Sequence, residues 1–256
     1  MRKKLIAGNW KMNLGYRESE KLAKEITSKL DDKYFEKTDV LICPTYVSLG
    51  IVNKTIKDTE IKLGAQDLFY ENDGAYTGEI SSEMIKSVGC EYVIIGHSER
   101  RKYQHESNKI INLKIKKAIE SGLKPILCVG ESLEEREDEI YESVVKEMLR
   151  DGLADISAED MSKIVIAYEP VWAIGTGLNA TPEQASDIHI FIRKYIAEKY
   201  DPALAGKLII LYGGSVNGKN SKDILSANDI DGALIGGASL KPDEFCDIVK
   251  IAYSVS

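Results

Sequence analysis

The sequence predicts an α/β protein that closes into a barrel of eight parallel strands, a (β/α)8 barrel. Short, apolar, β-branched stretches recur along all 256 residues, and each is followed by a longer amphipathic and charged segment. This alternation is typical of repeated strand–helix units, which build a parallel sheet. No long linker rich in Pro, Gly or Ser interrupts the units. Eight such units in succession favour a closed barrel over an open, doubly wound sheet.

Each predicted strand is a short apolar run. The eight strands are expected at Leu5–Ala7, Val40–Cys43, Ile61–Ala65, Tyr92–Ile95, Pro125–Val129, Ile164–Tyr168, Leu208–Tyr212 and Gly232–Ile235. Between them lie helical patterns such as Asn108–Ser121, in which apolar residues recur at spacings of three and four. Because a single barrel of this type commonly takes about 250 residues, we expect residues 1–256 to form one domain.

Composition and charge narrow the classes of partner. Hydrophobic residues make up 43% of the chain and charged residues 29%, as in ordinary globular proteins. The net charge of −7 argues against nucleic acid as a partner, although an anionic small molecule can still bind in a local cationic pocket. No apolar run approaches the roughly 20 residues of a membrane helix, and no export signal follows Met1–Lys4. We therefore expect a soluble, cytoplasmic protein without a membrane partner.

Metal and nucleotide sites find no support in the sequence. The four cysteines lie far apart and form no Cys-x-x-Cys pair, so buried free thiols are expected. The three histidines lack the spacing of a metal triad. Gly175-Thr176-Gly177 lacks the third glycine of a dinucleotide-binding turn. We expect chemistry that needs neither a metal nor a cofactor.

Functional residues of such barrels gather where the strands end, and strand six ends at a carboxylate. Glu169 follows the strand Ile164–Tyr168, and Pro170 then holds it out of the helical region. The glycines at 175 and 177 permit backbone angles that other residues resist, so the segment reads as a loop that can swing. This placement suits a general base beneath a closing lid. The alternative is a solvated Glu in an ordinary connection.

Glycine pairs follow the last two strands. Gly213-Gly214-Ser215 and Gly236-Gly237 stand where barrel enzymes often hold a phosphate on backbone amides and a short helix N-terminus. Either pair alone could be a tight turn. Two pairs at adjacent strand ends favour a phosphate cradle.

Three further polar residues follow strands one and four. Lys11 could attract an anion and stabilise negative charge on a carbonyl, and Asn9 would point the same way. His97 precedes a helix that Ser98 could help cap, and helix-end amides should keep its imidazole neutral. A surface lysine is the alternative for Lys11. A base, a neutral imidazole, an ammonium and a phosphate cradle together suit proton abstraction beside a carbonyl, whereas no Gly-x-Ser-x-Gly elbow supports a serine nucleophile.

The chain resembles the triosephosphate isomerase family over essentially its whole length. The matching strings are Gly8–Asn13, Gly74–Ile80, Ile95–Arg101, Ala167–Gly177, Tyr212–Val216 and Asp231–Leu240. The resemblance implies the TIM barrel fold and the interconversion of dihydroxyacetone phosphate and D-glyceraldehyde 3-phosphate through a cis-enediolate, in glycolysis and gluconeogenesis. This is the work of an intramolecular aldose–ketose isomerase.

The resemblance also implies the roles of individual residues. Glu169 would be the proton-transferring base and His97 the electrophile, with Lys11 and Asn9 in the same catalytic and substrate-binding pocket. Glu99 would have a supporting role. The positions that match phosphate binding are Gly175, Ser215, Gly236 and Gly237.

The string Gly74–Ile80 resembles the family loop that inserts into a neighbouring subunit, so a homodimer is implied, with Thr77 at the contact tip. The alternative is a solvated loop on a monomer. Two rival functions stay open: another phosphate-binding barrel that acts on a larger substrate, and a noncatalytic binding or scaffold protein that kept the barrel. The single small lid argues against the first, and the combination of Asn9, Lys11, His97 and Glu169 argues against the second.

Overall fold

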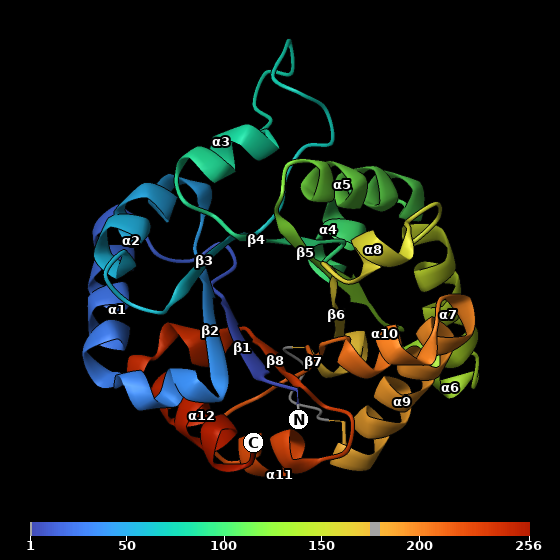
Figure 1. Ribbon diagram of the computed structural model, residues 1–256. Coiled ribbons are helices and arrows are strands. Elements are labelled where there is room, and N and C mark those ends of the chain that lie inside the picture. Colours follow the sequence, from blue (N-terminus) through green and yellow to red (C-terminus); the bar gives the residue numbers. More distant parts are fainter. Residues whose placement is uncertain (1, 175–179) are drawn as a thin grey trace.

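The computed structural model, which describes residues 2–174 and 180–256, contains a closed barrel whose strands run in sequence order from β1 to β8 (Figure 1). Every neighbouring pair of strands is parallel. The strands are β1 (Lys4–Asn9), β2 (Thr38–Cys43), β3 (Lys62–Ala65), β4 (Tyr92–Ile95), β5 (Lys124–Val129), β6 (Val165–Tyr168), β7 (Ile210–Tyr212) and β8 (Gly232–Ile235). The predicted barrel is confirmed.

The pair β1–β8 closes the barrel, with Leu5 opposite Gly232. A Cβ atom on Gly232 would lie 1.9 Å from the carbonyl oxygen of Leu5, and the residue has a φ of +146°. Glycine is therefore required where the first and last strands meet. Predicted and observed strand ends differ by up to two residues, since the pairing partner decides where a ladder stops.

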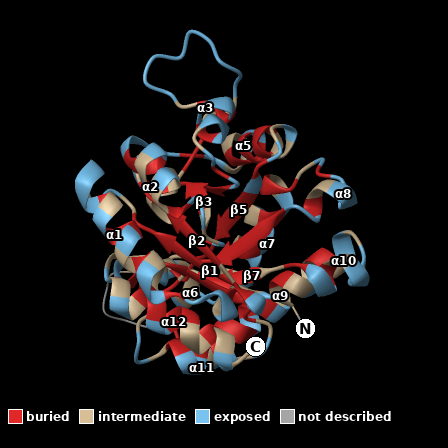
Figure 2. Cartoon of the chain, turned by 60° about the vertical axis from the view of Figure 1, so that its left-hand side comes forward, coloured by how far each residue is buried: buried red, intermediate tan, exposed pale blue. Residues whose placement is uncertain are grey.

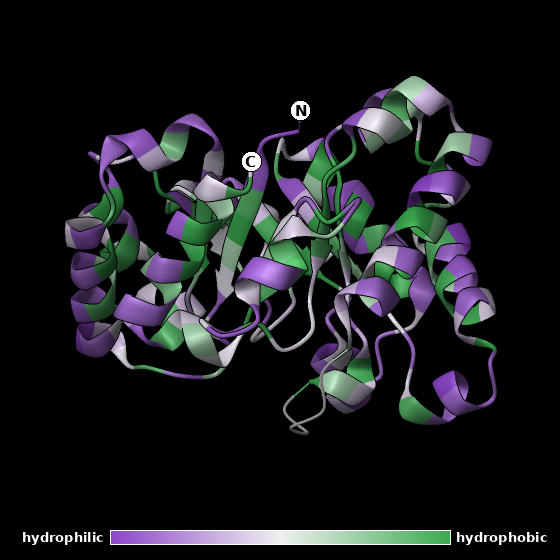
Figure 3. Ribbon diagram, turned by 90° about the horizontal axis from the view of Figure 1, so that it is seen from below, coloured by the Kyte–Doolittle hydropathy of each residue, from purple (hydrophilic) through white to green (hydrophobic). Residues whose placement is uncertain are grey.

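Helices surround the barrel, with hydrophobic faces toward the strands and hydrophilic faces outward (Figure 3). They are α1 (Tyr16–Lys29), α2 (Leu49–Ile56), α3 (Ser82–Ser87), α4 (Ser98–Tyr103), α5 (Asn108–Glu120), α6 (Leu133–Glu137), α7 (Tyr141–Gly152), α8 (Ala158–Met161), α9 (Pro182–Lys199), α10 (Pro202–Lys207), α11 (Ser221–Ser226) and α12 (Pro242–Ser254). Local signals set their starts: Thr181 and Gln184 form a capping box before α9, whose first residue is Pro182. None of these described helices is both long and apolar enough to cross a bilayer.

The core has two parts, one inside the barrel and one between the strands and the helices, and the strands are buried along most of their length (Figure 2). The inner part consists of Leu5, Ala7, Leu41, Cys43, Tyr92, Ile94, Ile126, Cys128, Val165, Ala167, Leu211 and Leu234. Each fully buried aliphatic side chain of this kind stabilises the fold by about 1.5–3 kcal/mol. The packed interior leaves the strand ends as the place for chemistry.

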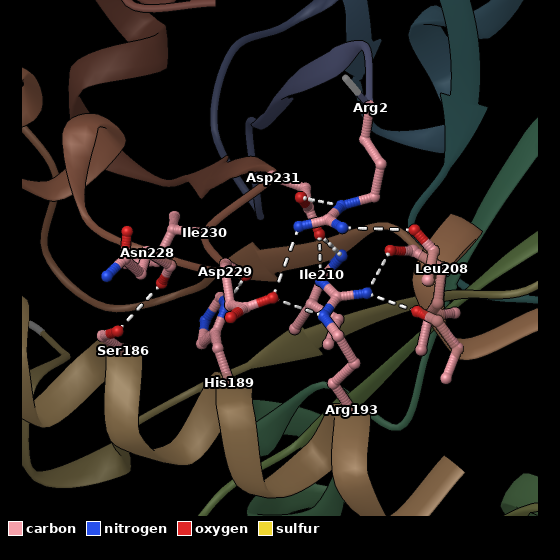
Figure 4. A network of polar contacts seen from close by, with 12 residues as sticks. Arg2, Ser186, His189, Arg193, Leu208, Ile210, Asn228, Asp229, Ile230 and Asp231 are labelled. Carbon is pink, nitrogen blue, oxygen red and sulfur yellow. Dashed lines mark hydrogen bonds and ion pairs between the residues drawn. The ribbon is translucent and has the colours of Figure 1, made fainter. Parts of the chain in front are cut away.

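A cluster of ion pairs ties the start of the chain to its end (Figure 4). We call Arg2, Arg193, Asp229 and Asp231 the Arg–Asp cluster. Arg193 donates to Asp229 Oδ1 at 2.6 Å and to Asp231 Oδ2 at 2.7 Å, and Arg2 Nε donates to Asp231 Oδ1 at 2.5 Å. The cluster joins α9, the residues before β8 and the segment before β1.

One loop, residues 71–79, stands out from the body of the molecule between β3 and α3 (Figures 1 and 2). All nine of its residues are exposed. Its base is closed by a hydrogen bond from the Phe69 amide to the Ile80 carbonyl at 2.8 Å. Residues 74–79 of the predicted contact segment therefore lie in the projecting part of the chain, and Ile80 lies at its base.

Candidate active site

A cavity of about 600 Å³ lies at the carboxyl ends of the strands. Among the residues that line it are Asn9, Lys11, His97, Glu99, Glu169, Gly213, Gly214, Ser215, Gly236 and Gly237. The barrel therefore brings together every site residue predicted from the sequence, apart from one. Gly175 lies outside the described residues.

Glu169 follows directly on β6, and its side chain is only 2% exposed. Its amide donates to the Val129 carbonyl at 2.7 Å, which continues the ladder to β5. A Cβ atom on Gly213 would lie 2.8 Å from Glu169 Cγ, so the glycine leaves room for the carboxylate. The backbone thus fixes the position of Glu169, and the adjacent strand leaves space beside its side chain.

Two neighbours hold the Glu169 carboxylate. The Ser98 amide donates to Oε2 at 3.0 Å, and His97 Nε2 lies 3.0 Å from Oε1, although the pair is not aligned as a good hydrogen bond. Burial raises the pKa of Glu169, but the charge and proximity of His97 and the Ser98 amide outweigh it and lower the pKa below the ordinary value. The candidate base is therefore ionised at neutral pH.

His97 itself is the N-cap of α4: its Nδ1 accepts from the Glu99 amide at 3.2 Å. The prediction that Ser98 helps to cap this helix is wrong, because α4 already begins at Ser98. With an amide proton aimed at Nδ1, the ring carries its own proton on Nε2, facing Glu169.

Three influences act on the protonation of His97, and together they do not give the lowered pKa expected from the sequence. The Glu99 amide opposes a proton on Nδ1. Burial also lowers the pKa of His97, but the carboxylate of Glu169 outweighs burial, so the pKa is raised above its ordinary value. The charge state of His97 therefore depends on how close the Glu169 carboxylate lies.

Lys11 lies beyond the end of β1 and has a φ of +51°, in the left-handed region that lysine seldom adopts. The conformation is held on both sides of the residue. Asn9 Oδ1 accepts from the Lys11 amide at 3.0 Å, and Gln66 Nε2 donates to the Lys11 carbonyl at 2.8 Å. The alternation of strand side chains therefore does not explain why Asn9 and Lys11 share the cavity. The turn after β1 does.

The ammonium group of Lys11 pairs with Glu99, at 2.7 Å between Nζ and Oε1. Glu99 also has Oε2 3.7 Å from His97 Nδ1. This carboxylate holds the lysine at the rim of the cavity, close to the histidine. We call Lys11, His97, Glu99 and Glu169 the catalytic cluster.

The glycines after β7 and β8 allow the main chain to approach closely. A Cβ atom on Gly214 would lie 2.2 Å from the hydroxyl of Tyr212, and one on Gly236 would lie 3.3 Å from Lys11 Cε. After β8 the chain turns into a short 3₁₀ helix, Gly237–Leu240. These main-chain segments face the cavity together with Ser215, on the side where an anion would meet backbone amides.

Sequence reasoning missed Glu131, which is fully buried. Its Oε1 accepts from the Tyr168 hydroxyl at 3.0 Å and from Trp172 Nε1 at 2.8 Å. The carboxylate thus links the end of β6 to the 3₁₀ turn Val171–Ala173 that follows Glu169. Its place just after β5 was the available signal, because the same rule of strand ends found Glu169 after β6.

Comparison with known proteins decides the family. The family model described as Triosephosphate isomerase matches residues 4–252. The chain belongs to the triosephosphate isomerase family. Proteins named triosephosphate isomerase are similar to it over nearly the full length of both chains. The one from Dictyoglomus thermophilum is 53% identical over 250 residues, covering 98% of this chain and 100% of the relative.

Two further proteins named triosephosphate isomerase are similar to this chain to about the same extent. The protein from Chloroherpeton thalassium is 51% identical over 252 residues, with 98% of this chain and 100% of the relative covered. The one from Clostridium botulinum is 49% identical over 250 residues, with the same coverage. The family resemblance seen in the sequence is confirmed.

Proposed function

We propose that this chain is an isomerase that interconverts dihydroxyacetone phosphate and D-glyceraldehyde 3-phosphate by proton transfer through a cis-enediolate. One observation carries the proposal: an ionised, buried carboxylate and an imidazole lie 3.0 Å apart in a cavity whose other side is lined by glycine-rich main chain. Membership of the triosephosphate isomerase family and the relatives' names support the same reaction. The family also implies a role in glycolysis and gluconeogenesis.

In this reaction Glu169 removes a proton from one carbon of the substrate and returns it to the neighbouring carbon. While it faces His97 in the free protein, its lowered pKa keeps it ionised, and the cavity side of the carboxylate has room beside Gly213. A positioned base of this kind typically contributes about 10²- to 10⁴-fold to the rate. The same carboxylate serves both transfers, so the chain needs one base.

His97 and Lys11 stabilise the negative charge that develops on the substrate oxygens. When Glu169 turns from His97 to the substrate, the influence that raises the pKa of His97 is withdrawn, and the Glu99 amide at Nδ1 favours the neutral ring. A neutral ring can donate its Nε2 proton to an oxygen. Each well-aimed donor of this kind is worth roughly 2.7–4 kcal/mol in the transition state.

The phosphate lies on the main chain of Gly213–Ser215 and Gly236–Gly237, with Gly175 as a further binding position. Asn9 and Lys11 hold the other end of the substrate. The segment from Pro170 to Gly177 would close over the phosphate, exclude water and prevent loss of phosphate from the intermediate. Glu131, through its hydrogen bond to Trp172, anchors the first turn of this lid.

Proton NMR in deuterated water tests the reaction directly. Purified protein with dihydroxyacetone phosphate should form glyceraldehyde phosphate, with deuterium entering at carbon, and Glu169→Gln should stop both. Product without deuterium would argue against enolisation by an exchangeable base. If neither product nor deuterium incorporation is detected, the result would favour the rival function, a noncatalytic phosphate-binding barrel or scaffold.

We also propose that the chain forms a homodimer through the Gly74–Ile80 loop, with Thr77 near the tip. A second cavity of about 210 Å³ lies beside Lys11 and His97. The exposed side chains of Met12 and Tyr103 line it. In this proposal the projecting loop of a second copy enters the recess. Light scattering should give about twice 28.4 kDa, and a monomer mass in dilute, active enzyme would refute the dimer.

The compartment is proposed to be the cytoplasm. All four cysteines are buried free thiols, as is usual in a reducing compartment. Fractionation of the source cells would check this location.

A further inference from the structure

A second large cleft opens at the opposite end of the barrel from the active site. It has a volume of about 490 Å³, and residues of α8 and α10 line it. Figure 1 shows these two helices on the same side of the barrel. The first residues of β4, β5 and β6 line it: Tyr92, Lys124 and Val165. The cleft therefore faces the amino ends of the strands, and no part of the proposed reaction uses it.

The floor of this cleft is apolar. Met161, Ile164 and Leu208 are almost fully buried in the fold and still line the cleft. Ile209, which packs against the core inside the barrel, adds a partly exposed aliphatic side chain. Clefts of about 300–1,000 Å³ with apolar walls and few polar groups are typical of small-molecule sites.

The rim of the cleft is cationic. Lys124, Lys163 and Lys207 line it, against a single carboxylate, Asp201. Asp201 already caps α10 by accepting from the Leu204 amide at 2.8 Å. A chain with a net charge of −7 thus gathers three ammonium groups around one apolar cleft.

Two of these three ammonium groups are available to a ligand. Lys163 pairs with Asp160 at 2.7 Å. Within residues 2–174 and 180–256, by contrast, no carboxylate lies at ion-pair distance from Lys124 or Lys207. The Lys124 ammonium instead lies 5.3 Å from the ring centre of Tyr92.

We propose that this cleft is a binding site for a small amphipathic anion, with an aliphatic tail on the apolar floor and a carboxylate or similar head group at Lys124 and Lys207. The apolar floor selects a tail, and the unpaired ammonium groups select the sign of the head group. A fully polar anion would leave the floor exposed to water, and a cationic amphiphile would meet like charge at the rim. The site is independent of catalysis, since it lies at the other end of the strands.

Methionine methyl NMR provides a local test with decanoate as the probe. In protein labelled with ¹³C at the methionine methyls, decanoate should shift the Met161 signal in a saturable manner. Met12, which is 94% exposed and lies at the recess beside the active site, should not move. Substitution Met161→Leu assigns the signal. An unmoved Met161 signal, or equal shifts at Met12 and Met84, would overturn the proposal.

Charge reversal at the rim tests the head-group contacts. The double variant Lys124→Glu/Lys207→Glu should bind decanoate about tenfold more weakly, since each reversal replaces attraction by repulsion at an exposed group. Lys222→Glu, on the exposed side of α11, is the matched control and should leave the affinity unchanged. Circular dichroism checks that the variants fold.

A ligand of opposite charge tests whether the cleft prefers anions. Decyltrimethylammonium has a similar tail with the opposite charge, and it should bind the native protein more weakly than decanoate and the double variant more tightly. Equal binding of both probes, or an unchanged affinity in the double variant, would mean that the apolar floor alone attracts amphiphiles, and the anion site would be refuted.

Discussion

The catalytic cluster and the Arg–Asp cluster both bring charged side chains into the protein, but they differ in how fully the charges are matched. In the Arg–Asp cluster, Asp231 accepts from Arg2, from Arg193 and from the Ile210 amide, all within 2.5–2.9 Å. In the catalytic cluster, the described residues give Glu169 one well-aligned donor, the Ser98 amide, and a misaligned histidine. The first carboxylate has three aligned donors and the second has one.

This difference indicates that the Arg–Asp cluster stabilises the fold, whereas the catalytic cluster is free to react. A carboxylate held by three fixed donors stabilises one conformation and has little capacity for a new partner. A buried carboxylate that lacks aligned donors can exchange its partner for a substrate proton. Substitution in the two clusters should therefore affect different measurements, turnover in one and unfolding in the other.

The largest effect is expected from Glu169→Gln, which removes the base and keeps the shape. Turnover should fall by about 10²- to 10⁴-fold, while phosphate-bearing inhibitors still bind, because the glycine main chain is untouched. Steady-state kinetics and inhibitor titration measure the two effects. Near-normal turnover would refute the base assignment.

Asp231→Asn should lower the stability of the fold and leave turnover nearly unchanged. Loss of its charge leaves Arg2 and Arg193 without one of their partners, and breaking a buried pair of this kind costs about 3–5 kcal/mol of stability. Urea unfolding measures the loss, while kcat of the folded fraction should stay close to the parent value. Asp223→Asn, at an exposed position in α11, is the control. A large fall in kcat at unchanged stability would reverse the assignments of the two clusters.

Next to the Arg–Asp cluster, His189 should make stability depend on pH. Its ring is fully buried, Nδ1 lies 3.0 Å from the Asp229 carbonyl, and burial lowers its pKa to about 4, from 6.5. Between these values the unfolded chain binds the extra proton, so stability falls as the pH drops from about 6.5 to about 4. The loss is at most about 3 kcal/mol.

Urea unfolding at several pH values, in the parent and in His189→Asn, isolates this contribution. The difference in unfolding free energy between the two proteins should change across that range and be constant above it. A constant difference at every pH would show that His189 does not titrate as its burial implies.

The smallest effect is expected at the phosphate end. Ser215→Asp places a negative charge beside the substrate phosphate, which should raise KM roughly 30-fold, a change of about 2 kcal/mol, with a smaller effect on kcat. Ser157→Asp is the matched control, since aspartate also caps a helix and Ser157 is the exposed N-cap of α8. An unchanged KM in Ser215→Asp would mean that the phosphate binds elsewhere.

The barrel could be predicted from the sequence because each strand is an apolar run whose length and pattern can be recognised from a few neighbouring residues. The sequence also located Glu169, His97, Lys11 and the glycine pairs, since all follow strand ends. What it could not show depends on contacts across the barrel. The Lys11–Glu99 pair joins residues from two strand ends, and the left-handed turn at Lys11 is held by the side chains of Asn9 and Gln66. The predicted cap at Ser98 failed because a histidine nitrogen can also accept a helix amide.

The closing of the barrel between Leu5 and Gly232 bears on how the protein is made. The ribosome synthesises β1 first and its partner β8 last, at roughly 5–20 residues per second, so one edge of β1 stays unpaired for roughly 10–50 s. An unpaired apolar edge invites association with other nascent chains. Arg2 stands just before that edge, and its positive charge discourages such pairing until Asp231, just before β8, is synthesised and neutralises it. We therefore expect Arg2, which is ion-paired in the mature fold, to protect the unpaired edge of β1 during translation.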